Sequence, residues 1–136
     1  MAKKKGIVTT MGKRKKAVAR AIAKPGTGKI IINGKPVGSI PNALPRMLVE
    51  EPIILAGDVS KQLDIAVNVS GGGIFGQASA VREAVAKAFV EWDGKLKKTF
   101  MEYDRTLLVS DARQTEPHKP SRSKAGPRRH KQRSKR

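Results

Sequence analysis

Hydrophobic and polar residues alternate most regularly in LDIAVNV, residues 63–69. Every second position carries a large apolar side chain, and the positions between carry Asp, Ala and Asn. Successive side chains of a strand point to opposite faces, so this pattern predicts a strand with one buried face. The buried face would hold Leu63, Ile65, Val67 and Val69.

A second set of strands is indicated by AVARAIAKPGTGKIIINGKPV, residues 17–37. A Pro-Gly-Thr-Gly turn separates two apolar runs, and Asn33-Gly34 follows the second. Asn-Gly readily adopts the positive φ values of a tight hairpin turn. We expect these strands to form a meander.

Helical periodicity dominates the stretch after residue 73. Apolar residues recur there at steps of three and four, which predicts an amphipathic helix laid on the sheet, with Glu83 and Lys87 paired on its exposed face. The core face would hold Ile74, Ala78, Val81, Val85, Ala88 and Trp92. NALPRMLVEEPIILAG, residues 42–57, indicates one or two short helical turns broken by Pro45 and Pro52. Strands with helices packed on one face define an α+β fold, a two-layer α/β sandwich with a mixed sheet.

The composition of the chain indicates a polyanionic partner. The chain has 136 residues and a formal net charge of +18. A charge so far from zero repels itself unless a partner such as nucleic acid neutralises it. No apolar run approaches the roughly 20 residues of a membrane span, and no helix pairs a basic face with Trp, Phe and Leu, so a membrane partner is not expected.

The chain has no Cys, which excludes disulfides and removes the usual ligands of a structural zinc. Its first residues lack the apolar stretch of a secretory signal. We therefore expect a cytoplasmic protein without metal or cofactor.

Basic residues gather in two segments. From Pro117 onward the sequence has nine Lys or Arg and no Asp or Glu. Such a segment buries too little surface to offset its ordering entropy, so we expect an extended basic tail over residues 113–136 after a globular domain over residues 1–112. The second cluster is Lys13, Arg14, Lys15 and Lys16. An isolated cluster is equally consistent with a solvated surface, but a tail without carboxylates favours a path along RNA.

Glycines 71, 73 and 76 match the G-x-G-x-x-G pattern of dinucleotide-binding sites, between a predicted strand and a predicted helix. Only one short apolar run, LLV at 107–109, follows, so a complete dinucleotide fold is not expected. Free N–H groups at a helix N-terminus suit any phosphate, including that of RNA. A purely structural role, in which the glycines allow a tight turn, is an equally open interpretation.

Candidate catalytic groups are sparse. The two histidines, His118 and His130, lie in the predicted tail, where no packing would orient them. Glu50 and Glu51 are adjacent and would point in different directions on a helix. The five aromatic residues fall in or beside helical patterns, which favours core packing over base stacking: Phe75, Phe89, Trp92, Phe100 and Tyr103. We expect no enzyme.

These segments resemble the family of the ninth ribosomal protein of the small subunit. The resemblance rests on GKRKKAVARA, INGKP, VSGGGIFGQASAVREAVAKAF, LLVSDARQTEPHKP and the terminal SKR, and it is closer to archaeal and eukaryotic members. It implies a left-handed βαβ crossover and a place in the subunit head, against the 3′ major domain of the rRNA and neighbouring ribosomal proteins. It also implies that the tail reaches the anticodon stem-loop of peptidyl-site tRNA.

The expected contacts follow from the basic clusters, the glycine turn and this resemblance. For rRNA they are Lys13, Arg14, Lys15, Lys16, Arg20, Gly71, Gly72, Gly73, Gln77, Arg82, Arg113, Lys119, Arg122, Lys124, Arg128, Arg129 and Lys131. For tRNA they are Arg133, Ser134, Lys135 and Arg136. Two other hypotheses stay open at this point: a small nucleotide-binding enzyme that uses residues 71–76, and a free-standing basic chaperone of RNA or DNA.

Overall fold

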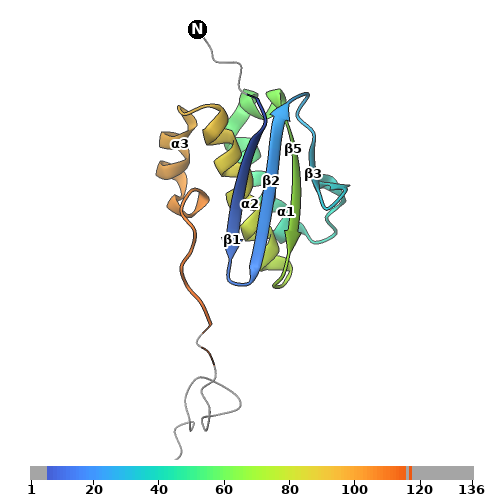
Figure 1. Cartoon of the computed structure of the whole chain (residues 1–136), viewed down its shortest axis with the longest axis vertical. Helices are drawn as coiled ribbons and strands as arrows, with labels where there is room; N and C mark the ends of the chain where they lie inside the picture. Colours follow the sequence, from blue (N-terminus) through green and yellow to red (C-terminus); the bar gives the residue numbers. More distant parts are fainter. Residues whose placement is uncertain (1–5, 116, 118–136) are drawn as a thin grey trace, which may run out of the picture.

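The computed structural model describes residues 6–115 and residue 117. Five strands form one mixed sheet, and the main helices cover one of its faces, as Figure 1 shows. The strands are β1 (Val8–Arg14), β2 (Ala17–Pro25), β3 (Ile30–Ile32), β4 (Lys35–Pro36) and β5 (Leu63–Ser70). The helices are α1 (Ala43–Ala56), α2 (Ile74–Trp92) and α3 (Leu96–Tyr103), with short 3-10 turns η1 (Val37–Ser39), η2 (Gly57–Gln62) and η3 (Arg105–Leu107). The α+β class, the mixed sheet and the one-sided helices are confirmed.

The strand order is β1-β2-β5-β3-β4. β5 pairs antiparallel with β2 and parallel with β3, so it separates two strands that are consecutive in the chain. The expected meander is therefore wrong. β5 is suited to this central place because Leu63, Ile65 and Val67 are all buried, as the alternation predicted, and both of its edges find a partner strand.

Two tight turns use residues with positive φ. Asn33 (φ 50°) and Gly34 (φ 81°) form the predicted turn between β3 and β4. The β1–β2 hairpin, which the sequence did not reveal, turns at Lys15 (φ 53°) and Lys16. The expected basic cluster of residues 13–16 thus spans the end of β1 and this turn.

α1 is one continuous helix, although both prolines lie within it. Pro45 is in the first turn, where a backbone N–H has no partner in the helix, so its missing donor costs little. Pro52 removes a single internal hydrogen bond, and its ring is buried against the rest of the core. The expected break into short turns is therefore wrong.

α2 packs against β1 and β2 on one side and against α1 on another. Four of the predicted core residues are buried: Ala78, Val81, Val85 and Ala88. Ile74 is instead 58% exposed, and Trp92 is half-buried. Gly12 of β1 is buried against α2 so closely that a Cβ there would overlap the carbonyl oxygen of Ala80. Because residue 12 has no side chain, the backbone of β1 packs directly against the backbone of α2.

The aromatic residues divide into two groups. Phe89 and Phe100 are fully buried, as expected, and Phe100 is the residue by which α3 enters the core. Phe75 and Tyr103 are 58% and 55% exposed, so core packing is wrong for these two. Phe75 follows the glycine turn at the start of α2, before the helix is covered by its neighbours.

Candidate nucleic-acid interface

Three segments that are far apart in the sequence meet at the lower end of the sheet in Figure 1: the β1–β2 turn, the glycine turn after β5, and the chain that follows η3. We call this region the basic end and define it as residues 13–16, 71–73 and 110–113. Lys13, Lys15 and Lys16 are exposed there, and no side-chain partner of theirs occurs among residues 6–115 and 117. The basic end therefore carries three free cations on the β1–β2 hairpin.

The glycine turn packs on that hairpin. Gly71 (φ 78°) and Gly72 (φ 66°) adopt the left-handed conformation that glycine favours, and a Cβ on Gly71 would overlap the carbonyl oxygen of Lys16. Gln77 steadies the turn by donating from Nε2 to the carbonyl oxygen of Gly71, at 3.2 Å. The structural role of these two glycines is thus shown directly.

Gly73 differs from its two neighbours. It has a negative φ of −97°, and a Cβ built on it meets nothing within 4 Å. It is the N-cap of α2, with no side-chain capping bond and no acidic residue in the first turn. The first backbone N–H groups of α2 therefore have no side-chain acceptor from the N-cap or the first turn. They lie next to the free lysines of the β1–β2 hairpin.

A buried carboxylate ties the end of the domain to this region. Glu83 of α2 is 3% exposed. Its Oε1 accepts from Ser110 Oγ at 2.5 Å and lies 2.6 Å from Lys87 Nζ, and its Oε2 accepts the backbone N–H of Lys13 at 3.1 Å. The predicted pair with Lys87 is confirmed, but its expected place on the exposed face is wrong. β1 and Ser110 cover that face: Lys13 and Ser110 donate to Glu83, and Lys87 donates to the carbonyl oxygen of Met11.

A second ion pair lies beside the first. Arg14 Nη1 is 3.0 Å from Asp111 Oδ2, and the two residues form an isolated parallel β-bridge. Arg14 Nη1 is buried and has no hydrogen bond of good geometry, so its attraction to Asp111 is that of an ion pair. We call Glu83, Ser110, Arg14 and Asp111 the tail latch, because together they fix the chain just before residue 113.

Asp111 also binds Arg113. It accepts the Arg113 backbone N–H at 3.0 Å and the Nε at 2.9 Å, and these bonds with the guanidinium hold the pKa of Asp111 well below its usual range. The Asp111 carboxylate is therefore ionised at neutral pH, and its negative charge neutralises one of the two positive charges of Arg14 and Arg113. The Arg113 side chain is 78% exposed, so its outer edge still faces solvent.

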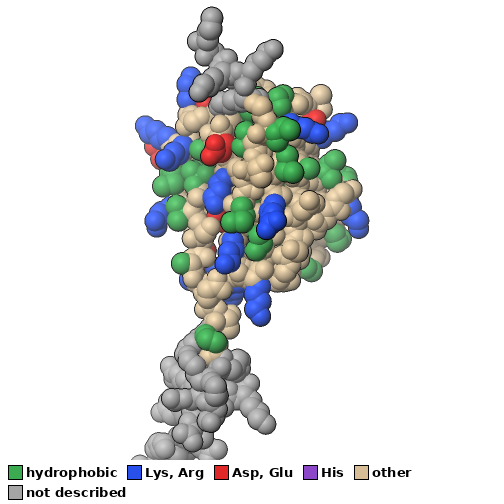
Figure 2. Space-filling model, viewed as in Figure 1, with side chains coloured by type: hydrophobic (Ala, Val, Ile, Leu, Met, Phe, Trp, Pro, Cys, Tyr) green, Lys and Arg blue, Asp and Glu red, His purple; other side chains and the backbone are tan. Residues whose placement is uncertain are grey.

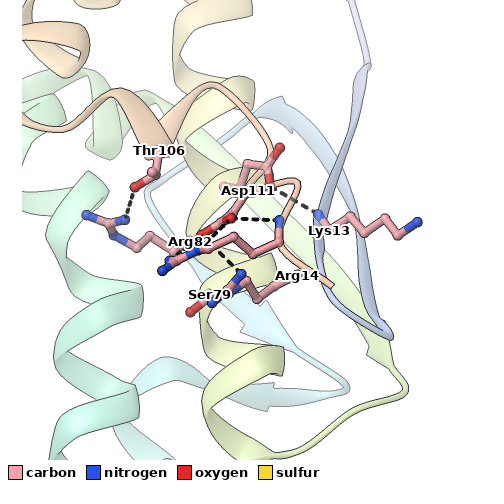
Figure 3. Close-up of a pocket in the computed structure, with 8 residues that line it drawn as sticks. Lys13, Arg14, Ser79, Arg82, Thr106 and Asp111 are labelled. Carbon is pink, nitrogen blue, oxygen red and sulfur yellow. Dashed lines mark hydrogen bonds and ion pairs between the residues drawn. The ribbon is translucent and has the colours of Figure 1, made fainter. Parts of the chain in front are cut away.

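Arg82 lies next to the latch but is already paired. Its guanidinium is 2.6 Å from Glu51 Oε2 and 3.0 Å from Asp104 Oδ2, and it donates to Thr106 Oγ1. Figure 3 shows Arg82 in a pocket of about 200 Å³ together with Arg14 and Asp111. Arg82 joins α1, α2 and η3, and the rRNA contact expected of it stays a prediction.

The uncovered face of the sheet adds a second basic surface. Arg20 of β2 is exposed there, directly opposite Asn68 of β5, in a shallow hollow with Val18, Val69 and Ser70. Figure 2, in the view of Figure 1, shows Lys and Arg side chains spread over this face, with hydrophobic side chains between them and few carboxylates. Arg20 thus lies outside the basic end but on a surface of the same sign.

The sequence reasoning missed Ser110, Asp111 and Asp64. Ser110 and Asp111 directly follow the LLV run in the sequence. Their role depends on the position of Glu83 in three dimensions, which the spacing of residues in the sequence does not predict. Residues 118–136, with the expected contacts from Lys119 to Arg136, lie outside the described residues. Residues 6–115 and 117 include no group of three His, Asp or Glu side chains that could hold a metal ion, and none of their helices is long and apolar enough to cross a membrane.

A small α+β domain with free cations at one end is typical of a protein that binds a polyanion. The family model described as ribosomal protein S9/S16 matches residues 12–136. The chain belongs to this family of ribosomal proteins. Its members are structural proteins of the ribosome, so the chain is not an enzyme, and the hypothesis of a nucleotide-binding enzyme is excluded.

Individual relatives agree with the family. The chain is 53% identical over 130 residues to the small ribosomal subunit protein uS9 of Methanococcus maripaludis strain C5, covering 94% of this chain and 97% of the relative. It is 52% identical over 130 residues to uS9 of Methanococcus vannielii, with the same coverage. It is 49% identical over 121 residues to uS9 of Desulfurococcus amylolyticus, covering 88% of this chain and 86% of the relative. The expected likeness to archaeal members is confirmed.

Proposed function

We propose that the chain is a structural constituent of the small ribosomal subunit on cytoplasmic ribosomes, and that it binds rRNA through the basic end. One observation carries this proposal: three lysines without a side-chain partner among the described residues lie on the β1–β2 hairpin, beside the uncapped N-terminus of α2. Lysine ammonium groups and helix N-terminal N–H groups both bind phosphate. The basic end therefore combines two kinds of phosphate ligand within one fixed frame.

The uncovered face of the sheet extends the proposed interface. Arg20 and Lys24 project from β2 and Lys13 from β1, with the polar side chains of Asn68 and Ser70 beside them on β5. This arrangement supports contacts to phosphate and sugar, which position a protein on RNA without selecting sequence. By resemblance to the family, we propose that the rRNA is the 3′ major domain in the subunit head. The connection from β3 through α1 to β5 is proposed to be left-handed on the same ground.

The tail is proposed to continue from the basic end to the peptidyl-site tRNA. The tail latch supports this, because it holds residues 110–113 beside the β1–β2 turn and so sets where the chain leaves the domain. The terminal cations would meet the anticodon stem-loop. Because these residues carry charge without an apolar core, the same chain can follow RNA along its length.

The experiment compares two pairs of exposed lysines. Lys15→Gln with Lys16→Gln removes charge from the basic end. Lys97→Gln with Lys98→Gln removes the same charge from α3, which lies beside the upper half of the sheet in Figure 1, away from the β1–β2 turn. Binding of the full chain to the rRNA of the subunit head is measured across a salt series. We expect the first pair to lower the salt slope by roughly 0.7–0.9 for each phosphate that is no longer neutralised, and the α3 pair to leave it unchanged. Equal slopes for the two variants would place the interface elsewhere.

Co-sedimentation after a high-salt wash separates this function from that of a free-standing chaperone. A constituent of the subunit stays with the particle at salt concentrations that remove non-specifically bound basic proteins. Loss of the wild-type chain from washed subunits would favour the chaperone.

A further inference from the structure

The outward side of α1 is apolar although nothing in the described structure covers it. Pro45, Val49, Pro52 and Ala56 form the buried side of the helix. On the opposite side Met47 is 58% and Ile54 is 74% exposed. A helix at the surface of a protein normally has one apolar stripe facing the core and a polar side facing water. α1 has a second apolar stripe.

Helix geometry places these side chains on one surface. Residues 47 and 54 are seven positions apart, which is two turns, so they lie on the same side of the helix. Leu44, 65% exposed, precedes Met47 by one turn. Scattered exposed apolar residues are ordinary, but three along one side of a helix form a strip of the kind that marks an interaction site.

The charges beside this strip argue against RNA. Glu50 lies between Met47 and Ile54, and it has no partner among the described residues. Its neighbour Glu51 is paired with Arg82 of α2, at 2.6 Å. α1 has a single basic residue, Arg46, in a chain whose net charge is +18. A phosphate placed on this strip would meet an unpaired carboxylate, which repels it.

A second copy of the chain fits poorly as well. A two-fold contact brings the same patch of each copy together. Glu50, which lies beside Met47 and Ile54, would then lie close to Glu50 of the other copy, and like charges facing each other oppose association.

We propose that the outward face of α1, formed by Leu44, Met47, Glu50 and Ile54, docks a segment of another ribosomal protein that presents apolar side chains next to a Lys or Arg. The apolar side chains of the partner cover Met47 and Ile54, and its cation pairs with Glu50. Buried apolar anchors with a charged group at their margin are the usual anatomy of a protein interface. The surface is separate from the basic end, so the chain would bind RNA with one region and protein with another.

Site-specific crosslinking in assembled subunits tests the proposal. A photoreactive phenylalanine derivative replaces Met47 or Ile54 in the full chain, and the same derivative at Tyr103 of α3, itself 55% exposed, is the control. We expect both α1 positions to crosslink to one ribosomal protein, within a peptide that carries apolar residues and a Lys or Arg, and the control to give a different product. Crosslinks to rRNA, to a second copy of this chain, or no product above the control would overturn the proposal.

A charge reversal provides an independent test. Glu50→Lys is compared with Glu102→Lys, which reverses a carboxylate that is 69% exposed on α3. The fraction of the crosslinked partner that stays in salt-washed subunits is measured, after thermal unfolding has shown that both variants fold. We expect Glu50→Lys to weaken retention of the partner by about tenfold and Glu102→Lys to leave it unchanged. Unchanged or stronger retention with Glu50→Lys would contradict a cationic partner.

Discussion

Asp64 shows how much one side chain organises at the residue scale. Its Oδ1 accepts the backbone N–H groups of Thr27, Gly28 and Lys29 at 2.9, 3.0 and 3.0 Å. One carboxylate therefore closes the turn between β2 and β3 from its place on β5. The sequence pattern assigned Asp64 only to the polar face of a strand. It contained no sign that the strand runs beside the turn.

The pKa of Asp64 leads to a prediction about acid. The N–H groups of Lys29, Thr27 and Gly28 hold this pKa below its ordinary value of 3.8. A lowered pKa in the folded state stabilises the fold above pH 3.8, and this contribution is lost as pH falls through the folded pKa. The unfolding free energy of Asp64→Asn should thus fall less steeply below pH 4 than that of the wild type, as measured by chemical denaturation. Asp58→Asn, at an exposed residue, is the control and should follow the wild type.

Gly73 allows the phosphate hypothesis to be tested without disturbing the fold. A side chain fits at this position, so Gly73→Val should fold normally and cover the first N–H groups of α2. We expect weaker binding to rRNA, by a similar factor for different RNA sequences, because the contact is to phosphate. Gly94→Val is a matched control, since a Cβ there also meets nothing within 4 Å. Unchanged affinity in a folded Gly73→Val variant would leave the glycine turn with a structural role alone.

At the scale of elements, local patterns predicted what depends on local sequence. β5, α2 and the Asn33-Gly34 turn follow from periodicity and backbone preference. The place of β5 between β2 and β3 does not, because any apolar strand with two free edges satisfies the same pattern. α1 was missed as a continuous helix because tertiary burial of Pro52 outweighs its poor helix propensity. At the site, the basic cluster was predicted from its run of Lys and Arg, and the glycine turn from its motif. Glu83 was expected on the exposed face because the residues that cover it, Lys13 of β1 and Ser110, are distant in the sequence.

The tail latch should contribute measurably to stability. Replacing Glu83 with Ala leaves Lys87, Ser110 and the Lys13 N–H without their shared acceptor in a buried place. We expect a loss of about 2–4 kcal/mol in the unfolding free energy. Ser110→Ala removes one bond and should cost about 1 kcal/mol. Chemical denaturation of the free protein measures both, and Glu102→Ala, exposed on α3, should change the free energy by less than about 0.5 kcal/mol. If Glu83→Ala also lowered the unfolding free energy by less than about 0.5 kcal/mol, the tail latch would not stabilise the fold.

At the scale of the whole molecule, the net charge of +18 leads to a prediction about the expected tail. Removing Ser134, Lys135 and Arg136 deletes two cations and no large apolar side chain, so folding and incorporation into subunits should be nearly unchanged. Affinity for peptidyl-site tRNA should fall, with a salt slope lower by roughly 0.7–0.9 per phosphate released and little dependence on the anticodon. Arg136→Ala should cost more than Lys135→Ala, because guanidinium binds phosphate with two bonds.

The measurement for this truncation is tRNA affinity on purified small subunits across a salt series. Wild-type affinity and slope in the truncated subunits would show that the tail ends short of the tRNA. The Lys97→Gln, Lys98→Gln variant serves as the control, because it removes the same number of charges from α3.

The central position of β5 determines when this protein can fold during its own synthesis. β2 and β3 are made first, but each has one edge that only β5 pairs, and β5 ends at residue 70. While the nascent chain is shorter than this, the β1–β2 hairpin has one open edge and β3 has only the two residues of β4 beside it. Unpaired edges attract other strands. The sheet therefore closes only after about half of the chain has left the ribosome that is making it, and until then its edges need protection from aggregation.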